Sequence, residues 1–239
     1  MTLSRRRVRA VAVKELREYR HNGNVVYATA ILPMVFLVQP LVEVFALPSS
    51  ASGLLHREHA LLYLLAVPAL VPAVLSSYAI VGERLQGTLE PVLTSPVRRS
   101  ELLLGKALAA FLPSVLVAYL VFGLYVGVVA LFARPGVAAA LLRGPDVLAQ
   151  VVFTPLLATW SIWVGIAIST RSSDPRNAGQ VAVLATLPTV AVTSLVAFQV
   201  IPATRPVALA FGIGLLVLDR LGSRFAAALF DRERLITGG

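Results

Sequence analysis

The sequence predicts an all-α, polytopic membrane protein with about six transmembrane helices, and three observations support this prediction. Of the 239 residues, 57% are hydrophobic and only 14% are charged. The mean hydropathy of +0.81 is too high for a soluble domain, which could not hide so much apolar surface in one core. Six apolar stretches are long enough to cross a bilayer, which takes about 20 residues each. Residues 1–239 are therefore predicted to form a single membrane domain.

Residues 1–24 predict an amphipathic helix at the membrane interface, because apolar and basic side chains separate onto opposite faces of a 3.6-residue period. Among its interface residues Lys14, Glu15 and Arg17, only Glu15 falls within the apolar arc, where lipid makes a carboxylate costly. Two alternatives stay open: Glu15 faces a protein partner, or its side chain reaches out to water. The apolar face carries Val8, Val11, Ala12, Leu16 and Tyr19, and the basic face carries Arg9, Lys14, Arg17 and Arg20.

Six apolar stretches follow, and each predicts one transmembrane helix. The last is the weakest of them, because Gly212, Gly214 and the pair Asp219–Arg220 leave its apolar run short. Prolines fall inside several of the stretches and predict bent helices rather than additional loops. The predicted spans are residues 25–47, 60–81, 107–132, 147–168, 181–201 and 207–221.

The first of these spans is predicted to be a retained helix and not a cleaved signal peptide. Its apolar run is too long for a signal peptide, and it contains Gln39 and Glu43. Glu43 is an intramembrane acid, which makes it a candidate residue of the transport pathway. It also lies near enough to the outer surface to reach water instead.

The distribution of Lys and Arg predicts a cell-membrane protein with both termini in the cytoplasm. The chain carries 21 Lys and Arg against 12 Asp and Glu, a net charge of +9. Seventeen of the basic residues fall on the side of the two termini and four on the other side, and the positive side of most membrane proteins is cytoplasmic. In a membrane chain this excess indicates contact with anionic membrane lipids rather than with nucleic acid.

The connection after the second span, residues 83–106, is the most informative segment. It is polar at its start and amphipathic afterwards, with Glu83 and Glu90 set among apolar residues. Pro91 limits a first helical piece, and Ser95–Pro96 supplies an N-cap followed by a proline at the first helical position. We expect a helix, a break and a second helix, which lie flat below the membrane.

Four cytoplasmic segments together resemble the permease subunits of ATP-binding-cassette (ABC) transporters of the type-2 exporter family. They are VAVKELREYR before the first span, GERLQGTLEPVLTSPVRRSELLLGK after the second, STRSSDPRNAGQ after the fourth and FDRERLITGG at the end. In that family the second of these segments carries a coupling helix that docks on the ATPase. One departure is the connection of residues 199–206, which is too short for the re-entrant extracellular helices of many members.

The resemblance implies a permease that forms the translocation pathway and couples it to ATP hydrolysis by a separate ABC-type ATP-binding subunit. It also implies a second permease copy, in a homodimer or a heterodimer, and transport in the direction of export. Glu83 and Glu90 would accept charge-assisted hydrogen bonds from the ATPase, and Gly87 would allow its close approach. The implied docking residues are Glu83, Arg84, Gln86, Gly87, Thr88 and Glu90.

The sequence contains no pattern that predicts catalysis, a cofactor or a metal site. Its one Gly-Lys pair, Gly105–Lys106, lacks the glycine-rich loop and the following Ser or Thr of a P-loop, so we expect ATP to be hydrolysed elsewhere. His56 and His59 flank Arg57–Glu58 in an order that matches no zinc-protease motif, and a polar helix start accounts for them better. Cysteine is absent.

A stand-alone secondary transporter or channel is the alternative function. Such a protein more often shows two related halves and charged residues near the bilayer midplane, and neither is clear in this sequence. An intramembrane enzyme would need a motif such as Gly-x-Ser-x-Gly or His-Glu-x-x-His, and the sequence has neither.

Overall fold

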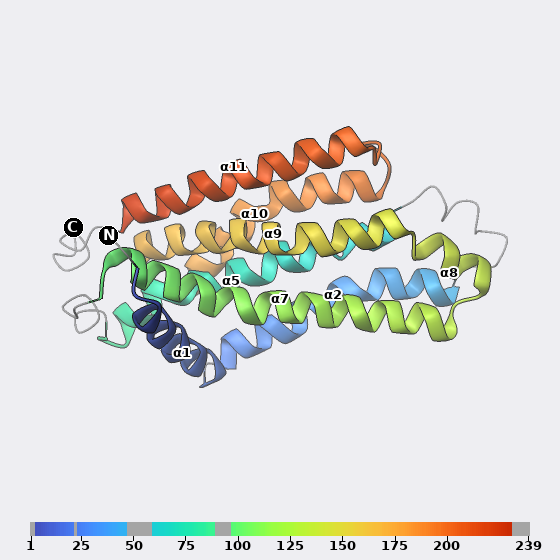
Figure 1. Cartoon of the computed structure of the whole chain (residues 1–239). Coiled ribbons are helices and arrows are strands. Elements are labelled where there is room, and N and C mark those ends of the chain that lie inside the picture. Colours follow the sequence, from blue (N-terminus) through green and yellow to red (C-terminus); the bar gives the residue numbers. More distant parts are fainter. Residues whose placement is uncertain (1–2, 22, 47–58, 89–96, 231–239) are drawn as a thin grey trace.

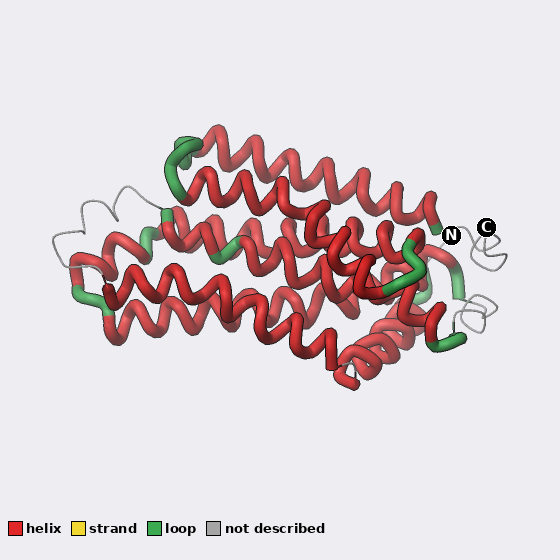
Figure 2. The backbone as a smooth tube through the Cα atoms, turned by 180° about the vertical axis from the view of Figure 1, so that it is seen from behind, coloured by secondary structure: helices red, strands yellow, loops and turns green. Residues whose placement is uncertain are grey.

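The computed structural model describes residues 3–21, 23–46, 59–88 and 97–230. These residues form helices joined by short turns, and none of those described forms a strand (Figures 1 and 2). The long helices lie side by side in one elongated bundle, and the shorter α1 packs at one end of it. The helices are α1 (Arg5–His21), α2 (Gly23–Ala46), α4 (Ala60–Tyr63), α5 (Ala66–Leu85), α7 (Arg99–Phe132), α8 (Pro135–Leu141), α9 (Gly144–Arg171), α10 (Pro175–Ala197) and α11 (Arg205–Leu229).

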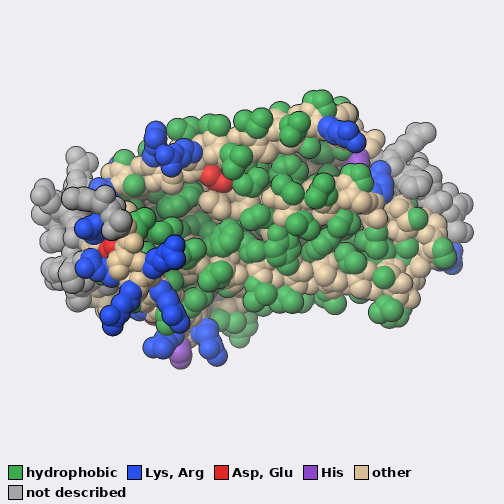
Figure 3. Space-filling view, in the orientation of Figure 1, with side chains coloured by type: hydrophobic (Ala, Val, Ile, Leu, Met, Phe, Trp, Pro, Cys, Tyr) green, Lys and Arg blue, Asp and Glu red, His purple; other side chains and the backbone are tan. Residues whose placement is uncertain are grey.

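Five helical stretches are long and apolar enough to cross a membrane. They are α4 together with α5, then α7, α9, α10 and α11, and a shorter apolar stretch covers Thr29–Val42 within α2. Large hydrophobic side chains cover the outer surface of these helices, as the face in Figure 3 shows. Such a surface suits lipid tails, which are as apolar as leucine. The chain is therefore an all-α polytopic membrane protein, as its sequence predicts.

α5 is the central helix of the bundle. It packs most extensively on α9 and also meets α2, α7 and α10, so most of its side chains are buried. Small residues bring α5 and α9 together, since a Cβ atom added at Gly165 would collide with Ser76. The Ser161 hydroxyl also donates a hydrogen bond of 2.6 Å to the carbonyl of Ala69. Close backbone approach and interhelical hydrogen bonds of this kind stabilise helix pairs in lipid.

The second predicted span, residues 60–81, is interrupted near its start. α4 ends at Tyr63, and α5 begins at Ala66 after two residues in a turn. Pro68 explains the interruption, because it has no N–H to donate and its ring clashes with the carbonyl four residues earlier. α5 then continues past the predicted end of the span, so that Glu83 lies in its last turn.

α7 covers what the sequence divides into a cytoplasmic helix and a separate span. It runs without interruption from Arg99 to Phe132, which is 34 residues or about 51 Å at 1.5 Å per residue. The sequence places the start of this piece at Ser95–Pro96, which lies outside the described residues, whereas the N-cap is Arg98. No proline lies between Arg99 and Ala107, and the expected boundary after residue 106 is absent.

α11 is longer than the predicted span of residues 207–221. It begins at Arg205 and ends at Leu229, because Asp219 and Arg220 end the apolar run without ending the helix. The connection before it is short and contains no helix between Ala197 and Arg205. The structure therefore has no re-entrant helix at this point, in keeping with the length of the connection.

Candidate functional site

The N-terminal helix α1 packs directly on the start of α7. Its buried side chains are Val8, Ala12, Glu15 and Tyr19, which belong to the apolar arc that the sequence predicts. Contact is closest at Gly105, where an added Cβ atom would lie 2.6 Å from the Cβ atom of Val11. The apolar face of α1 is therefore covered by protein and not by lipid.

Four charged side chains meet where α1, α5 and α7 converge. The ammonium group of Lys106 donates to Glu15 Oε1 over 2.6 Å and lies 3.0 Å from Glu83 Oε1. Lys14 donates to the same Glu83 oxygen over 2.8 Å and lies 3.8 Å from Glu15 Oε1. We refer to Lys14, Glu15, Glu83 and Lys106 as the four-charge cluster. It joins three helices that lie far apart in the sequence.

The four-charge cluster is largely removed from solvent. The exposed fraction is 0% for Lys106, 2% for Glu15 and 3% for Glu83, and only Lys14 is partly exposed. Two positive and two negative charges balance, which a buried group of charges requires. Lys106 also donates to the carbonyl of Ala79 over 2.6 Å, so its ammonium group has acceptors on both α1 and α5.

The surroundings shift the pKa values of two members of the cluster. Burial raises the pKa of Glu15, and the neighbouring Glu83 carboxylate adds to this, while the cations Lys106 and Lys14 oppose it. For Lys14, partial burial lowers the pKa, but the hydrogen bond to Glu83 and the charges of Glu83 and Glu15 outweigh it. The pKa of Lys14 therefore lies above its usual value, and this lysine stays charged.

A second contact fastens the beginning of α1 to α7. Glu101, in the first turn of α7, accepts hydrogen bonds from the backbone N–H groups of Ser4 over 2.8 Å and Arg98 over 3.0 Å. Arg7 Nη1 also lies 3.4 Å from its Oε2. Glu101 is 1% exposed, so this carboxylate serves the junction and is not open to a partner.

The end of α5 forms a tight cap at Gly87. The N–H of Thr88 donates to the carbonyl of Glu83 over 3.0 Å, and the N–H of Gly87 donates to that of Arg84 over 3.3 Å. This pair of bonds is the Schellman motif, which needs a left-handed residue after the C-cap, and Gly87 has a φ of 68°. Gly87 therefore ends the helix, and the cap leaves Gln86 exposed three residues after Glu83.

Arg84 connects the same end of α5 to the end of α9. Its guanidinium donates to the carbonyl of Ser172 over 2.9 Å and to that of Thr170 over 3.4 Å. The last carbonyls of a helix lack partners within it and carry its negative dipole end, so a cation there is favourable. The ends of α1, α5, α7 and α9 are thus held together by charged side chains.

The structure places Glu83 away from the expected docking surface, and the position of Glu15 matches neither of the two alternatives for it. Both carboxylates lie inside the four-charge cluster, because Lys106 and Lys14 neutralise them there. Glu83 is therefore not available on a docking surface, and Glu15 neither faces an external partner nor reaches water. Arg17 is exposed on the outer face of α1.

The remaining docking candidates differ in their exposure. Gln86 and Gly87 are exposed, Thr88 and Arg84 are partly exposed, and Glu90 lies outside the described residues. Leu85, which the sequence did not single out, is 62% exposed beside them. The exposed turn is therefore Leu85 to Thr88.

Sequence reasoning also missed Lys106 and Glu101. Sequence patterns assign Lys106 to the cytoplasmic connection and to an incomplete P-loop, although a lysine amid Leu and Ala at the start of a span is itself a signal of a buried partner. Glu101 occupies the third position of α7, where a carboxylate that returns to the N-cap N–H is expected.

Glu43 and the histidines at the opposite end give no functional site. Glu43 lies within α2, but its side chain is outside what the structure describes. His59 Nδ1 lies 2.7 Å from Asp146 Oδ1, which joins the starts of α4 and α9. His56 lies outside the described residues, and those that are described contain no group of three His, Cys, Asp or Glu side chains placed to hold a metal.

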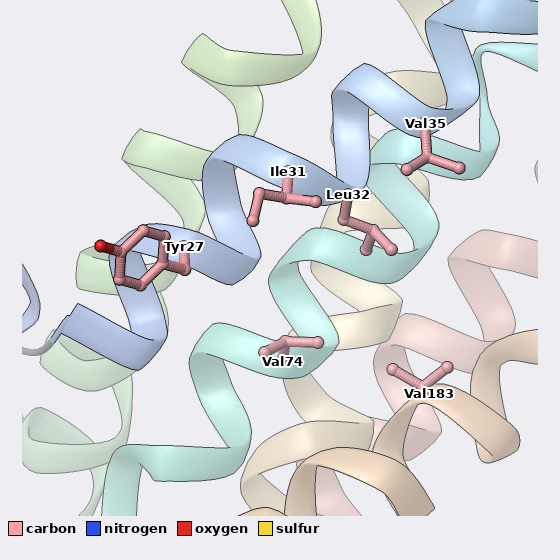
Figure 4. Close-up of a pocket in the computed structure, with 6 residues that line it drawn as sticks. All are labelled: Tyr27, Ile31, Leu32, Val35, Val74 and Val183. Atoms are coloured by element: carbon pink, nitrogen blue, oxygen red, sulfur yellow. The ribbon is translucent and has the colours of Figure 1, made fainter.

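An apolar groove opens on the side of the bundle between α2, α5 and α10 (Figure 4). Its volume is about 270 Å³. Its lining provides apolar surface and no charged group, so it can bind apolar groups but offers no acid or base for catalysis. The lining residues are Tyr27, Ile31, Leu32, Val35, Val74 and Val183.

Comparison with protein families gives one match that spans most of the chain. The model of the ABC-2 family transporter protein matches residues 9–210, from α1 to the first turns of α11. A comparison with curated proteins finds no significant match.

Proposed function

Because the chain belongs to the ABC-2 transporter family, as a membrane-spanning permease, we propose that it exports its substrate with energy from a separate ATP-binding subunit. A permease of this family is a translocation component and not itself catalytic, which agrees with the absence of a P-loop from the sequence. The proposal includes a second permease copy, identical or different, so that two permeases and two ATPases form the complex.

The proposed orientation places the end of the bundle that carries α1 in the cytoplasm of a cell-membrane protein. The N-terminal helix α1 and the C-terminal end of α11 both lie there (Figure 1). The basic residues of this end include Arg84, Arg98, Arg171 and Arg176, and cytoplasmic segments are enriched in Lys and Arg. A cytoplasmic ATPase would then meet the turn of Leu85 to Thr88.

The observation that carries the coupling proposal is the direct connection between this exposed turn and the four-charge cluster. Glu83 accepts the Thr88 N–H through its backbone carbonyl and holds Lys14 and Lys106 through its side chain. A push on the turn therefore acts on α5, and through the cluster on α1 and α7. A packed and ion-paired junction moves as a unit, which is what a lever between an ATPase and membrane helices requires.

An exposed glutamine at each end of the bundle permits a matched test of the docking turn. Gln86→Arg places a bulky cation on the turn, and Gln199→Arg makes the same change at an exposed position at the opposite end. We expect Gln86→Arg to reduce the copurifying ATP-binding subunit about 10-fold, which corresponds to roughly 1.4 kcal/mol. Gln199→Arg should leave the yield unchanged, and both variants should unfold at the wild-type temperature. Equal yields from the two variants would contradict docking at this turn.

A further inference from the structure

Asp219 lies in the middle of an apolar seam between α11 and α9. Its neighbours along the stripe are Leu215, which is 1% exposed, and Gly222, where an added Cβ atom would lie 3.1 Å from Trp163 Cβ and 3.3 Å from Trp160 Cζ3. Positions four before and three after Asp219 share its face of the helix. Asp219 therefore faces α9 at about the level of the two tryptophans.

Asp219 has no partner for its charge among the residues that the structure describes. Its Oδ1 atom is buried and accepts no hydrogen bond, and no cation of the described residues lies within ion-pair distance. Arg220 and Arg224, although near in sequence, are exposed. Every other carboxylate whose side chain is described accepts a hydrogen bond or forms an ion pair. These carboxylates are Glu15, Glu18, Glu83, Glu101, Asp146 and Asp174.

One of the two indoles near Asp219, that of Trp160, also lacks a hydrogen bond in the described part of the chain. Trp160 Nε1 is buried and has no hydrogen-bond acceptor, so Trp160 and Asp219 do not bond to one another. Gly222 has no side chain to cover the indoles, and Trp160, Trp163 and Asp219 are each partly exposed. Asp219 is ten residues from Leu229, the end of α11, which is about 15 Å along the helix. A molecule within the membrane can thus reach a carboxylate and two aromatic faces together.

We propose that Asp219, Trp160 and Trp163 form a binding site for a lipophilic organic cation. A cationic ligand would supply the positive charge that the Asp219 carboxylate lacks, and indoles are the aromatic side chains that attract cations most strongly. The apolar surroundings require that the rest of the ligand be hydrophobic. A bare metal ion fits poorly, because it needs several oxygen or nitrogen ligands and the described residues provide one carboxylate here. The site concerns binding alone and is independent of how transport is energised.

The chain has only two tryptophans, Trp160 and Trp163, so its tryptophan fluorescence reports on this site. The experiment titrates the purified full chain in lipid nanodiscs with tetraphenylphosphonium and with the neutral triphenylphosphine oxide. We expect a saturable fluorescence change with the cation, and at least a 10-fold weaker affinity in Asp219→Asn. The neutral compound should show no dependence on Asp219. Asp174→Asn, which removes an exposed carboxylate elsewhere, should bind the cation like the wild type.

Two further variants keep the test decisive. Asp219→Glu retains the charge and should retain cation binding even where Asp219→Asn fails to fold. Trp160→Phe leaves Trp163 as the reporter and should weaken the cation several-fold, because phenylalanine attracts cations less than tryptophan. The proposal is overturned if the wild type shows no saturable response, or if Asp219→Asn and the wild type bind the cation equally. An equal response to the neutral compound would also overturn it.

Discussion

The ammonium group of Lys106 lies 2.6 Å from Oε1 of Glu15, an ion pair between residues 91 positions apart that is almost fully buried. It fixes the N-terminal helix to the long helix α7 at the end of the bundle where we place the ATPase. Because Glu83 shares the same lysine, the pair also includes the end of α5. The connection between these three helices supports our proposal that the segment before the first span takes part in coupling.

Removal of Lys106 should strongly destabilise the protein. Lys106→Ala leaves Glu15 and Glu83 buried with only Lys14 nearby, and loss of one partner of a buried pair costs about 3–5 kcal/mol. The double variant Lys106→Met/Glu15→Leu should lose less than Lys106→Ala, since it removes both charges. Thermal unfolding in detergent measures the difference, with the exposed Arg20→Ala as control. If Lys106→Ala unfolded at the wild-type temperature, the pair would carry no stability.

A side chain at position 105 should separate α1 from α7. Gly105→Ala brings a Cβ atom to 2.6 Å from Val11, and overpacking of this kind costs about 1–3 kcal/mol. Val11→Ala in the same chain should restore part of the loss. Gly123→Ala is the matched control, because nothing lies within 4 Å of a Cβ atom there. The same unfolding temperature for both alanine variants would contradict the close contact.

Because Gly87 has a left-handed backbone conformation, a side chain at this position should lower stability even though it would touch no neighbouring atom. A Cβ atom at Gly87 meets nothing within 4 Å, so Gly87→Ala should cost about 1 kcal/mol through the backbone alone. Gly87→Asn should cost less, since asparagine tolerates this region. Gly82→Ala, which lies five residues earlier within α5 and is also free of contacts, should be neutral or stabilising. Stability measurements on the three variants test this order.

The raised pKa of Glu15 predicts a dependence of stability on pH. The folded protein holds this proton more tightly than the unfolded chain, whose value is near 4.5. The contribution of Glu15 to stability is therefore greatest below that pH and declines as pH rises toward the folded pKa. The free energy of unfolding is measured against pH for the wild type and for Glu15→Gln. Subtracting the second curve from the first isolates the contribution of Glu15. A difference that rises with pH in this window would contradict the raised pKa of Glu15.

The fold could be predicted further than the site, and the reason is the range of the interactions. The apolar runs locate the spans, since length and hydropathy are local properties. The placement of Glu15 within an apolar arc indicates a buried carboxylate, but its partner Lys106 lies 91 residues away. No local pattern identifies such a partner, and Glu83 therefore appeared to be a surface residue when only its neighbours were considered.

Helix ends were predicted less well where a charged residue lies inside a helix and not at its end. Asp219–Arg220 ended the apolar run of the last span, yet α11 continues to Leu229. In the same way Lys106 appeared to mark the end of a cytoplasmic segment, whereas α7 contains it without a break. In both cases hydropathy measured the apolar length and not the helical length. Two of the charged residues inside the helices, Lys106 and Asp219, are residues on which our proposals rest.

The most direct test of the central claim is to purify the tagged chain from its native cells in mild detergent and identify every stoichiometric partner by mass spectrometry. The account predicts an ABC-type ATP-binding subunit at one copy per permease, together with a second permease copy. A lone oligomer that retains no ATPase after gentle crosslinking would contradict it and would point to a transporter driven by an ion gradient.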